Sequence, residues 1–241
     1  MFFRKSPPVR PELLKIDGRL LEVRVRLNPR ARRMIVKVNP ATGEVSVTAP
    51  TRRGVSAALD FARGEREWIA GQLAKAPGPV PLAIGAVIPF QGHPHEICAA
   101  TRGVAPVWAE GGVIWVRGDA AHAPRRVTDF LKREARKALE TRVLEHAGRL
   151  GVKPSRITVR DTASRWGSCS TARALSFSWR LILAPAFVLD YVVAHEVAHL
   201  REMNHSPRFW AHVKSLVPGM NTAQAWLRAN GRDLQRYAVK P

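Results

Sequence analysis

Cysteine is scarce in this sequence: among 241 residues there are two, Cys98 and Cys169. Two thiols cannot build the disulfide framework of a small secreted protein, and they suit a reducing cytoplasm. No apolar run approaches the length of a membrane span. Met1 to Lys15 carries charges and prolines where a signal peptide would carry its apolar segment. We therefore expect a cytoplasmic protein with no membrane partner.

Acidic residues are also few: 19 Asp and Glu stand against 39 Lys and Arg, which gives a formal net charge of +20. The basic excess lies in residues 1–76 and 123–241, whereas residues 77–122 are nearly neutral. Such an excess favours nucleic acid, phosphorylated ligands or acidic surfaces as partners. A well-solvated surface explains it equally well, because no nucleic-acid-binding motif accompanies the charge. The charge is compatible with nonspecific nucleic-acid contact but does not establish it.

The first half of the chain has the pattern of a β-rich region. Alternating or short apolar runs predict strands at 19–27, 34–38, 44–48, 84–90, 96–100, 104–108 and 113–117. A helical pattern occupies residues 54–75, and a proline-rich connector follows at 76–81. We expect residues 1–122 to form an antiparallel β-rich N-terminal region with one helix, and we find no internal repeat.

The second half is mainly helical. Apolar periodicity predicts helices at 124–150, 185–200, 206–216 and 221–229, with short strands at 156–160 and 174–183. Residues 123–241 should therefore form a helical core with a small sheet. The whole chain is predicted to be an α+β protein in which this second region carries the chemistry.

The strongest motif is H-E-x-x-H at residues 195–199, inside the apolar run 185–200. His195 and His199 are one helical turn apart, so both rings can point at one metal ion. Glu196 lies roughly 100° around the helix, beside that point. Two imidazoles that hold a divalent cation, with a neighbouring carboxylate as a base for water, are the groups that zinc-dependent hydrolysis requires.

A third histidine, His205, follows six residues after the motif. On a continuous helix it would lie roughly 9 Å beyond His199, too far to share a metal. Asn204 and the pair Ser206-Pro207 predict that one helix ends and another begins there, so the chain can fold back and supply His205 as a ligand. Glu202 is a possible hydrogen-bond acceptor for a ligand histidine.

Four segments carry a family resemblance: S-R-W-G-S-C, F-S-W-R-L-I-L-A-P, D-Y-V-V-A-H-E-V-A-H-L and M-N-H-S-P-R-F-W. With them, residues 164–210 resemble the YgjP-like family of metal-dependent hydrolases, relatives of the SprT-like zinc metallopeptidases. The resemblance implies a zincin-like core with zinc held by His195, His199 and His205, and Glu196 as the catalytic residue. Glu202 stands where metzincins have glycine, which disfavours that class.

Two residues of the first segment need interpretation. Arg165 can face the cleft and stabilise developing negative charge, or it can be a structural arginine that pairs with Asp161. Cys169 is interpreted as a small apolar residue rather than a nucleophile, because metal chemistry is available.

These observations favour a zinc-dependent peptidase that uses a metal-activated water with Glu196 as general base. An extended peptide could then lie along the predicted strand 174–183. A nucleotide phosphoanhydride would suit the same metal and base, so the choice between peptide and nucleotide substrates stays open, as does the oligomeric state. A third hypothesis is a nucleic-acid-associated binding protein with structural zinc, which the open fourth ligand position disfavours.

Overall fold

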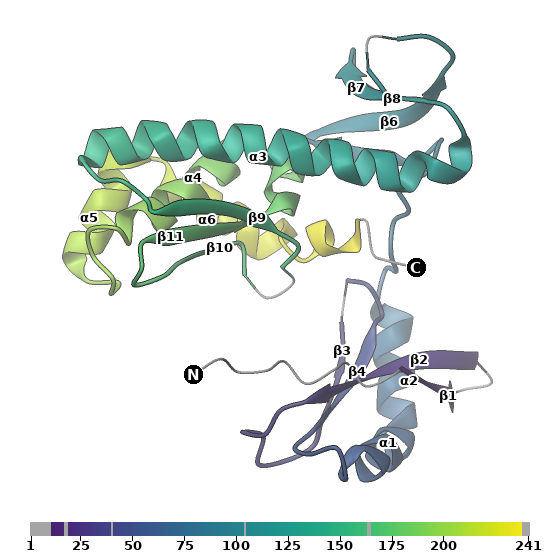
Figure 1. Cartoon of the computed structure of the whole chain (residues 1–241). Coiled ribbons are helices and arrows are strands. Elements are labelled where there is room, and N and C mark those ends of the chain that lie inside the picture. Colours follow the sequence, from purple (N-terminus) through teal and green to yellow (C-terminus); the bar gives the residue numbers. More distant parts are fainter. Residues whose placement is uncertain (1–10, 17–18, 40, 104, 163–164, 238–241) are drawn as a thin grey trace. The chain divides into compact units, whose positions relative to one another are not determined.

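The computed structural model describes residues 11–16, 19–39, 41–103, 105–162 and 165–237. The chain divides into two compact units, Met1–Pro79 and Val80–Pro241 (Figure 1). Residues 1–10, which bear on the signal-peptide prediction, and Ser164 of the first family segment lie outside the described residues. No helix in the described part of the chain is long and apolar enough to cross a membrane.

The first unit is a sheet packed on two helices. Its elements are β1 (Glu12–Ile16), β2 (Arg19–Leu27), β3 (Ile35–Val38), β4 (Val45–Ala49), α1 (Val55–Gly64) and α2 (Arg66–Lys75). The strand order is β1-β2-β4-β3. The alternation predicted for β2 is confirmed, because Val23 and Val25 are buried while Arg24 and Arg26 are exposed. Strand β1 is additional to the predicted strands.

The helix predicted at 54–75 is interrupted at one point. It divides into α1 and α2 at Glu65, which leaves helical geometry directly after Gly64. Glycine has a low helix propensity because it loses the most backbone entropy on ordering. Both helices nevertheless bury residues in the same core, including Leu59 of α1 and Ile69 of α2.

The second unit begins with another four-stranded sheet. Its strands are β5 (Val87–Phe90), β6 (His93–Ala100), β7 (Val107–Glu110) and β8 (Val113–Arg117), in the order β5-β6-β8-β7. Its central pair, β6 and β8, is parallel, as is the central pair β2 and β4 of the first sheet. The two sheets therefore share one topology, a repeat that the sequence does not reveal. The expected antiparallel pairing holds for the outer pairs and is wrong for the central ones.

This second sheet packs with the helical region. Ile97 and Ile114 lie in the same core as Leu131 of α3 (Ala123–Leu150). The backbone N–H of Gln91, in the β5–β6 turn, donates to the carbonyl of Ile182 at 2.7 Å. The division between units therefore falls at Pro79, inside the proline-rich connector, and differs from the boundary expected at residue 122.

The rest of the second unit is a small sheet with helices α3 and α4 (Ala186–Ala198) packed against it (Figure 1). Its elements are η1 (Ala120–His122), β9 (Arg156–Arg160), β10 (Gly167–Cys169), β11 (Ala174–Ser178), η2 (Trp179–Leu183), α4 (Ala186–Ala198), α5 (Pro207–Leu216), α6 (Met220–Asn230) and η3 (Asp233–Arg236). The sheet order is β10-β11-β9, with β11 parallel to β9 and antiparallel to β10. The predicted α+β fold, with a helical core and a small sheet, is confirmed.

The strand predicted at 174–183 is shorter than expected. It ends at Ser178, whose hydroxyl accepts a hydrogen bond from the backbone N–H of Arg180 and so begins the 3-10 helix η2. Trp179, Leu181 and Leu183 are all buried, as the apolar pattern required, but on a helical turn rather than on one face of a strand. The same apolar residues fit either conformation.

Several arginines in this unit satisfy carbonyl groups at helix ends. Arg149 donates to the carbonyl of Leu216 at 3.0 Å, at the end of α5, and Arg201 donates to the carbonyl of Leu150 at 3.0 Å, at the end of α3. The last carbonyls of a helix have no partner within it, and a cation there also complements the helix dipole. Part of the basic excess is therefore structural.

Candidate metal centre

Helix α4 carries the H-E-x-x-H motif and is buried on most of its surface. Val193, Val197 and Ala198 are buried, which leaves the two histidines and Glu196 as polar groups in apolar surroundings. The rings of His195 and His199 lie on one face, with centroids 5.0 Å apart. The helix ends at Ala198, with His199 as its C-cap, several residues before Asn204, where the sequence placed the break.

The following turn brings the third histidine back to this face. Ser206 is the N-cap of α5, its hydroxyl accepts from the N–H of Phe209 at 3.3 Å, and Pro207 is the first helical residue, as predicted. The side chain of Asn204 accepts from the N–H of Ser206 at 3.1 Å, which fixes the turn. As a result, ligand atoms of His195, His199 and His205 all lie within 4.8 Å of one another. His212, the next histidine along the chain on α5 (Pro207–Leu216), is not part of this cluster.

The spacing of these nitrogens suits a tetrahedral metal ion. The Nε2 atoms of His195 and His205 are 3.2 Å apart. Two nitrogens that are each about 2.05 Å from a tetrahedral zinc ion would be about 3.3 Å apart. The ring of Phe209 packs against all three imidazoles, with centroid distances of 4.9, 4.5 and 4.7 Å, and so holds them in place. A set of three imidazoles fits a divalent transition metal.

One hydrogen bond fixes which nitrogen of His199 is available. Its Nδ1 lies 3.0 Å from the backbone carbonyl oxygen of Glu202. A carbonyl only accepts, so Nδ1 carries the proton and Nε2 presents its lone pair. Glu202 is thus the partner that the sequence suggested, but through its backbone rather than its carboxylate. The Nδ1 atom of His195 is buried with no hydrogen-bond partner among the described residues.

Burial favours the neutral form of the two histidines of the H-E-x-x-H motif, His195 and His199. It lowers the pKa of His195 to about 4, and the charges of His199 and His205 add to this effect. Burial also lowers the pKa of His199, although the carbonyl of Glu202 acts in the opposite direction. Neutral imidazoles are the form that binds a metal, so these pKa shifts reduce competition from protons.

Glu196 lies beside the histidines and is 7% exposed. Burial raises its pKa to about 7, against the opposing charge of Arg165. The carboxylate is packed against strand β10: a Cβ placed on Gly167 would lie 2.5 Å from Cγ of Glu196. Only glycine therefore allows this approach. Sequence reasoning missed this role of Gly167, for which the only signal was the glycine within S-R-W-G-S-C.

Arg165 is exposed and close enough to Glu196 for its charge to lower that carboxyl's pKa. Asp161, its alternative partner, instead forms an ion pair with Arg180. Cys169, two residues after Gly167, is half-buried, and burial together with the charge of Glu196 raises the pKa of its thiol. A thiol that stays protonated is a poor nucleophile.

The fold and the three-histidine cluster together describe a protein of the metallopeptidase class. The chain belongs to the YgjP-like family: residues 32–230 match the family described as YgjP-like, metallopeptidase domain. Among solved structures it is similar to the metallopeptidase zymogen abylysin from Pyrococcus abyssi, with 22% sequence identity and a TM-score of 0.35. That match covers 42% of this chain and 99% of the abylysin chain. No curated protein matches the sequence.

Proposed function

We propose that this protein is a zinc-dependent peptidase with His195, His199 and His205 as zinc ligands and Glu196 as general base. The observation that supports it best is the convergence of three imidazoles next to one buried carboxylate. A zinc ion held there would polarise a substrate carbonyl and make a coordinated water more acidic. Zinc is preferred because structural and catalytic zinc sites commonly use imidazole ligands.

Glu196 performs the proton transfers in this proposal. With a pKa raised by burial to about 7, its carboxylate can accept a proton from the attacking water and return it to the leaving amine. Arg165 places a positive charge on the same side of the site and can stabilise negative charge on the reacting carbonyl oxygen. Gly167 keeps Glu196 in position by leaving room for its side chain.

We place the peptide-binding strand elsewhere than along residues 174–183, where the sequence suggested it. Strand β11 is already bonded to β9 on one side and to β10 on the other, so it cannot accept a further strand. Strand β10 is an edge of the small sheet and carries Gly167 against Glu196. An extended peptide that pairs with β10 would pass directly beside the proposed base, which favours a peptide substrate over a nucleotide.

We also assign the protein to a reducing compartment, the cytoplasm. Cys98 and Cys169 are free thiols. Oxidation of Cys169 would alter the strand that packs on Glu196, so a reducing environment protects the proposed site.

The decisive experiment combines metal analysis with two substrate classes. The purified protein is assayed against a denatured protein and against nucleoside triphosphates, with Glu196→Gln as the test variant and Glu202→Gln as the control. We expect Glu196→Gln to keep its zinc and lose proteolysis by about 10²- to 10⁴-fold, because an amide cannot accept the proton. Glu202→Gln should retain activity, because only the backbone carbonyl of Glu202 contacts His199.

Each alternative has its own outcome in this assay. Hydrolysis of triphosphates alone, lost in Glu196→Gln, would identify a phosphoanhydride hydrolase. Zinc binding with no hydrolysis of either substrate would support a structural site in a binding protein. Proteolysis at the wild-type rate in Glu196→Gln would show that the base is another residue.

A further inference from the structure

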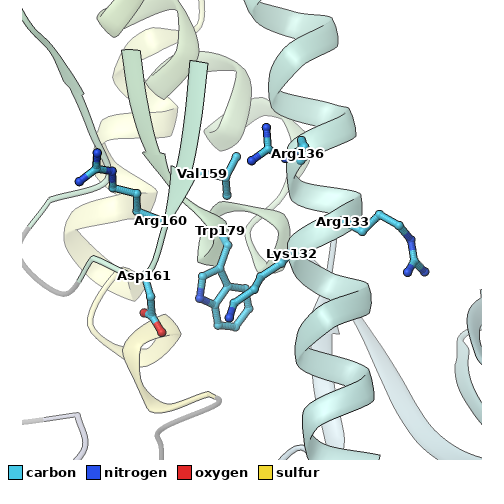
Figure 2. Close-up of a pocket in the computed structure, with 7 residues that line it drawn as sticks. All are labelled: Lys132, Arg133, Arg136, Val159, Arg160, Asp161 and Trp179. Atoms are coloured by element: carbon cyan, nitrogen blue, oxygen red, sulfur yellow. The ribbon is translucent and has the colours of Figure 1, made fainter. Parts of the chain in front are cut away.

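A pocket of about 370 Å³ lies between α3, the end of β9 and η2 (Figure 2). Its lining residues are Lys132, Arg133, Arg136, Val159, Arg160, Asp161 and Trp179. None of them belongs to the three-histidine cluster. The pocket is therefore a separate feature of the fold, and the proposed peptidase mechanism does not use it.

Four basic residues and one acidic residue line this pocket. Figure 2 shows that the guanidinium groups of Arg133 and Arg160 point away from it, which leaves Lys132 and Arg136 as its cations. The carboxylate, Asp161, is neutralised by its ion pair with Arg180. Within the described part of the chain, the side chain of Lys132 forms no hydrogen bond or ion pair. The pocket thus keeps positive charge that internal pairing does not explain.

The inner wall of the pocket holds a hydrogen-bond donor without an acceptor. Trp179 is 0% exposed, and its indole Nε1 has no partner among the described residues. An indole nitrogen only donates, and buried polar groups in proteins are almost always satisfied. The guanidinium of Arg180 stacks on the ring, 4.6 Å from its centroid, and fixes its position. Figure 2 shows the indole between Asp161 and α3, the helix that carries Lys132.

We propose that this pocket binds a phosphate group. Its oxygens would accept hydrogen bonds from the indole N–H of Trp179 and the ammonium of Lys132, and Arg136 would add a further cation from the next turn of α3. Arg136 already pairs with Glu140 at 3.0 Å, so it contributes mainly charge. A phosphate offers several acceptor oxygens and up to two negative charges. It therefore matches a pocket with more than one cation better than a ligand with a single carboxylate would.

The phosphate could belong to a free small molecule or to a nucleic-acid backbone, because the chemistry that recognises both is the same. Two probes separate these sources: inorganic phosphate, titrated by calorimetry, and a fluorescein-labelled oligothymidine, followed by anisotropy. Both are measured with the full chain at low and at moderate salt. Binding of the oligonucleotide should weaken with salt, since it releases condensed counterions.

Two lysine variants form the matched pair. Lys132→Gln removes a charge from the pocket, whereas Lys137→Gln removes the same charge from the same helix at a residue that lines another pocket. We expect the affinity for phosphate to fall about tenfold in Lys132→Gln, the typical effect of losing one charged hydrogen bond. Lys137→Gln should stay within about twofold of wild type, because screened distant charges contribute little.

A third variant tests the indole. Trp179→Phe removes the N–H and should also weaken phosphate binding by several-fold; its melting temperature is measured to verify folding. If the oligonucleotide binds more tightly than phosphate, and Lys132→Gln but not Lys137→Gln loses this binding, the source is nucleic acid. If phosphate binds and the oligonucleotide binds no more tightly than phosphate, the source is a small ligand. Equal losses in the two lysine variants, or no binding of either probe to wild type, would overturn the proposal.

Discussion

Replacement of Gly167 by alanine tests whether strand β10 positions the proposed base. The added Cβ would lie 2.5 Å from Cγ and 2.6 Å from Oε1 of Glu196. Non-bonded carbons normally stay about 3.5 Å apart or more, so the carboxylate must move by about 1 Å. A misplacement of that size typically costs about 10²-fold in rate, or about 2.7 kcal/mol of transition-state stabilisation. We expect Gly167→Ala to lose about that much proteolytic turnover.

The same variant should keep its metal, because nothing near Gly167 in this contact is a histidine. Zinc content is therefore measured beside turnover, and thermal unfolding verifies that the sheet survives. Gly148→Ala is the control: its added Cβ would meet no atom within 4 Å, and its position inside α3 favours alanine. Wild-type turnover in Gly167→Ala, or loss of zinc together with activity, would refute the positioning role.

Two further predictions concern histidines. His205→Ala should weaken zinc binding by more than about a hundredfold, because loss of a residue that only hydrogen-bonds a ligand already costs about 10- to 100-fold. His212→Ala should bind zinc with the wild-type affinity. A competition titration with a chelator compares the two variants. His146, 1% exposed, bonds Asp190 at 2.8 Å, so His146→Leu should lower the free energy of unfolding by about 1–3 kcal/mol in urea titrations. Glu145→Gln, which removes an exposed pair, should change it by less than about 1 kcal/mol, and equal effects would contradict this ranking.

The three-histidine cluster was predictable because the residues that determine it are close together in the sequence. The spacing of His195 and His199 follows from helix geometry alone, and the return of His205 follows from the capping residue Ser206 and from Pro207. The positions of all three side chains thus follow from neighbouring residues in one short segment of the chain. The helix ended earlier than predicted, but the fold-back survived, because the N-cap of α5 sets the direction of the chain after the turn.

The features that sequence reasoning missed depend on contacts between distant segments. Gly167 and Glu196 are far apart in the sequence, and nothing in either segment shows that they touch. His146 lies in the helical pattern 124–150, where nothing local shows that it is buried and that α4 supplies Asp190 as its partner. The parallel pairing of β6 and β8 is also long-range, since either strand alone has the pattern of an antiparallel one.

The net positive charge does not tell which cations are paired within the protein, and the structure does. Arg149 and Arg201 donate hydrogen bonds to carbonyls at helix ends, and Arg180 pairs with Asp161. These cations are therefore not available to an external anion. The side chain of Lys132, in contrast, has no partner in the described residues and lines a pocket with an unsatisfied indole N–H. Because all of these residues count equally toward the net charge, that sum cannot separate structural cations from binding ones. The placement of each side chain does, and it directs the search for an anionic ligand to one pocket rather than to the whole surface.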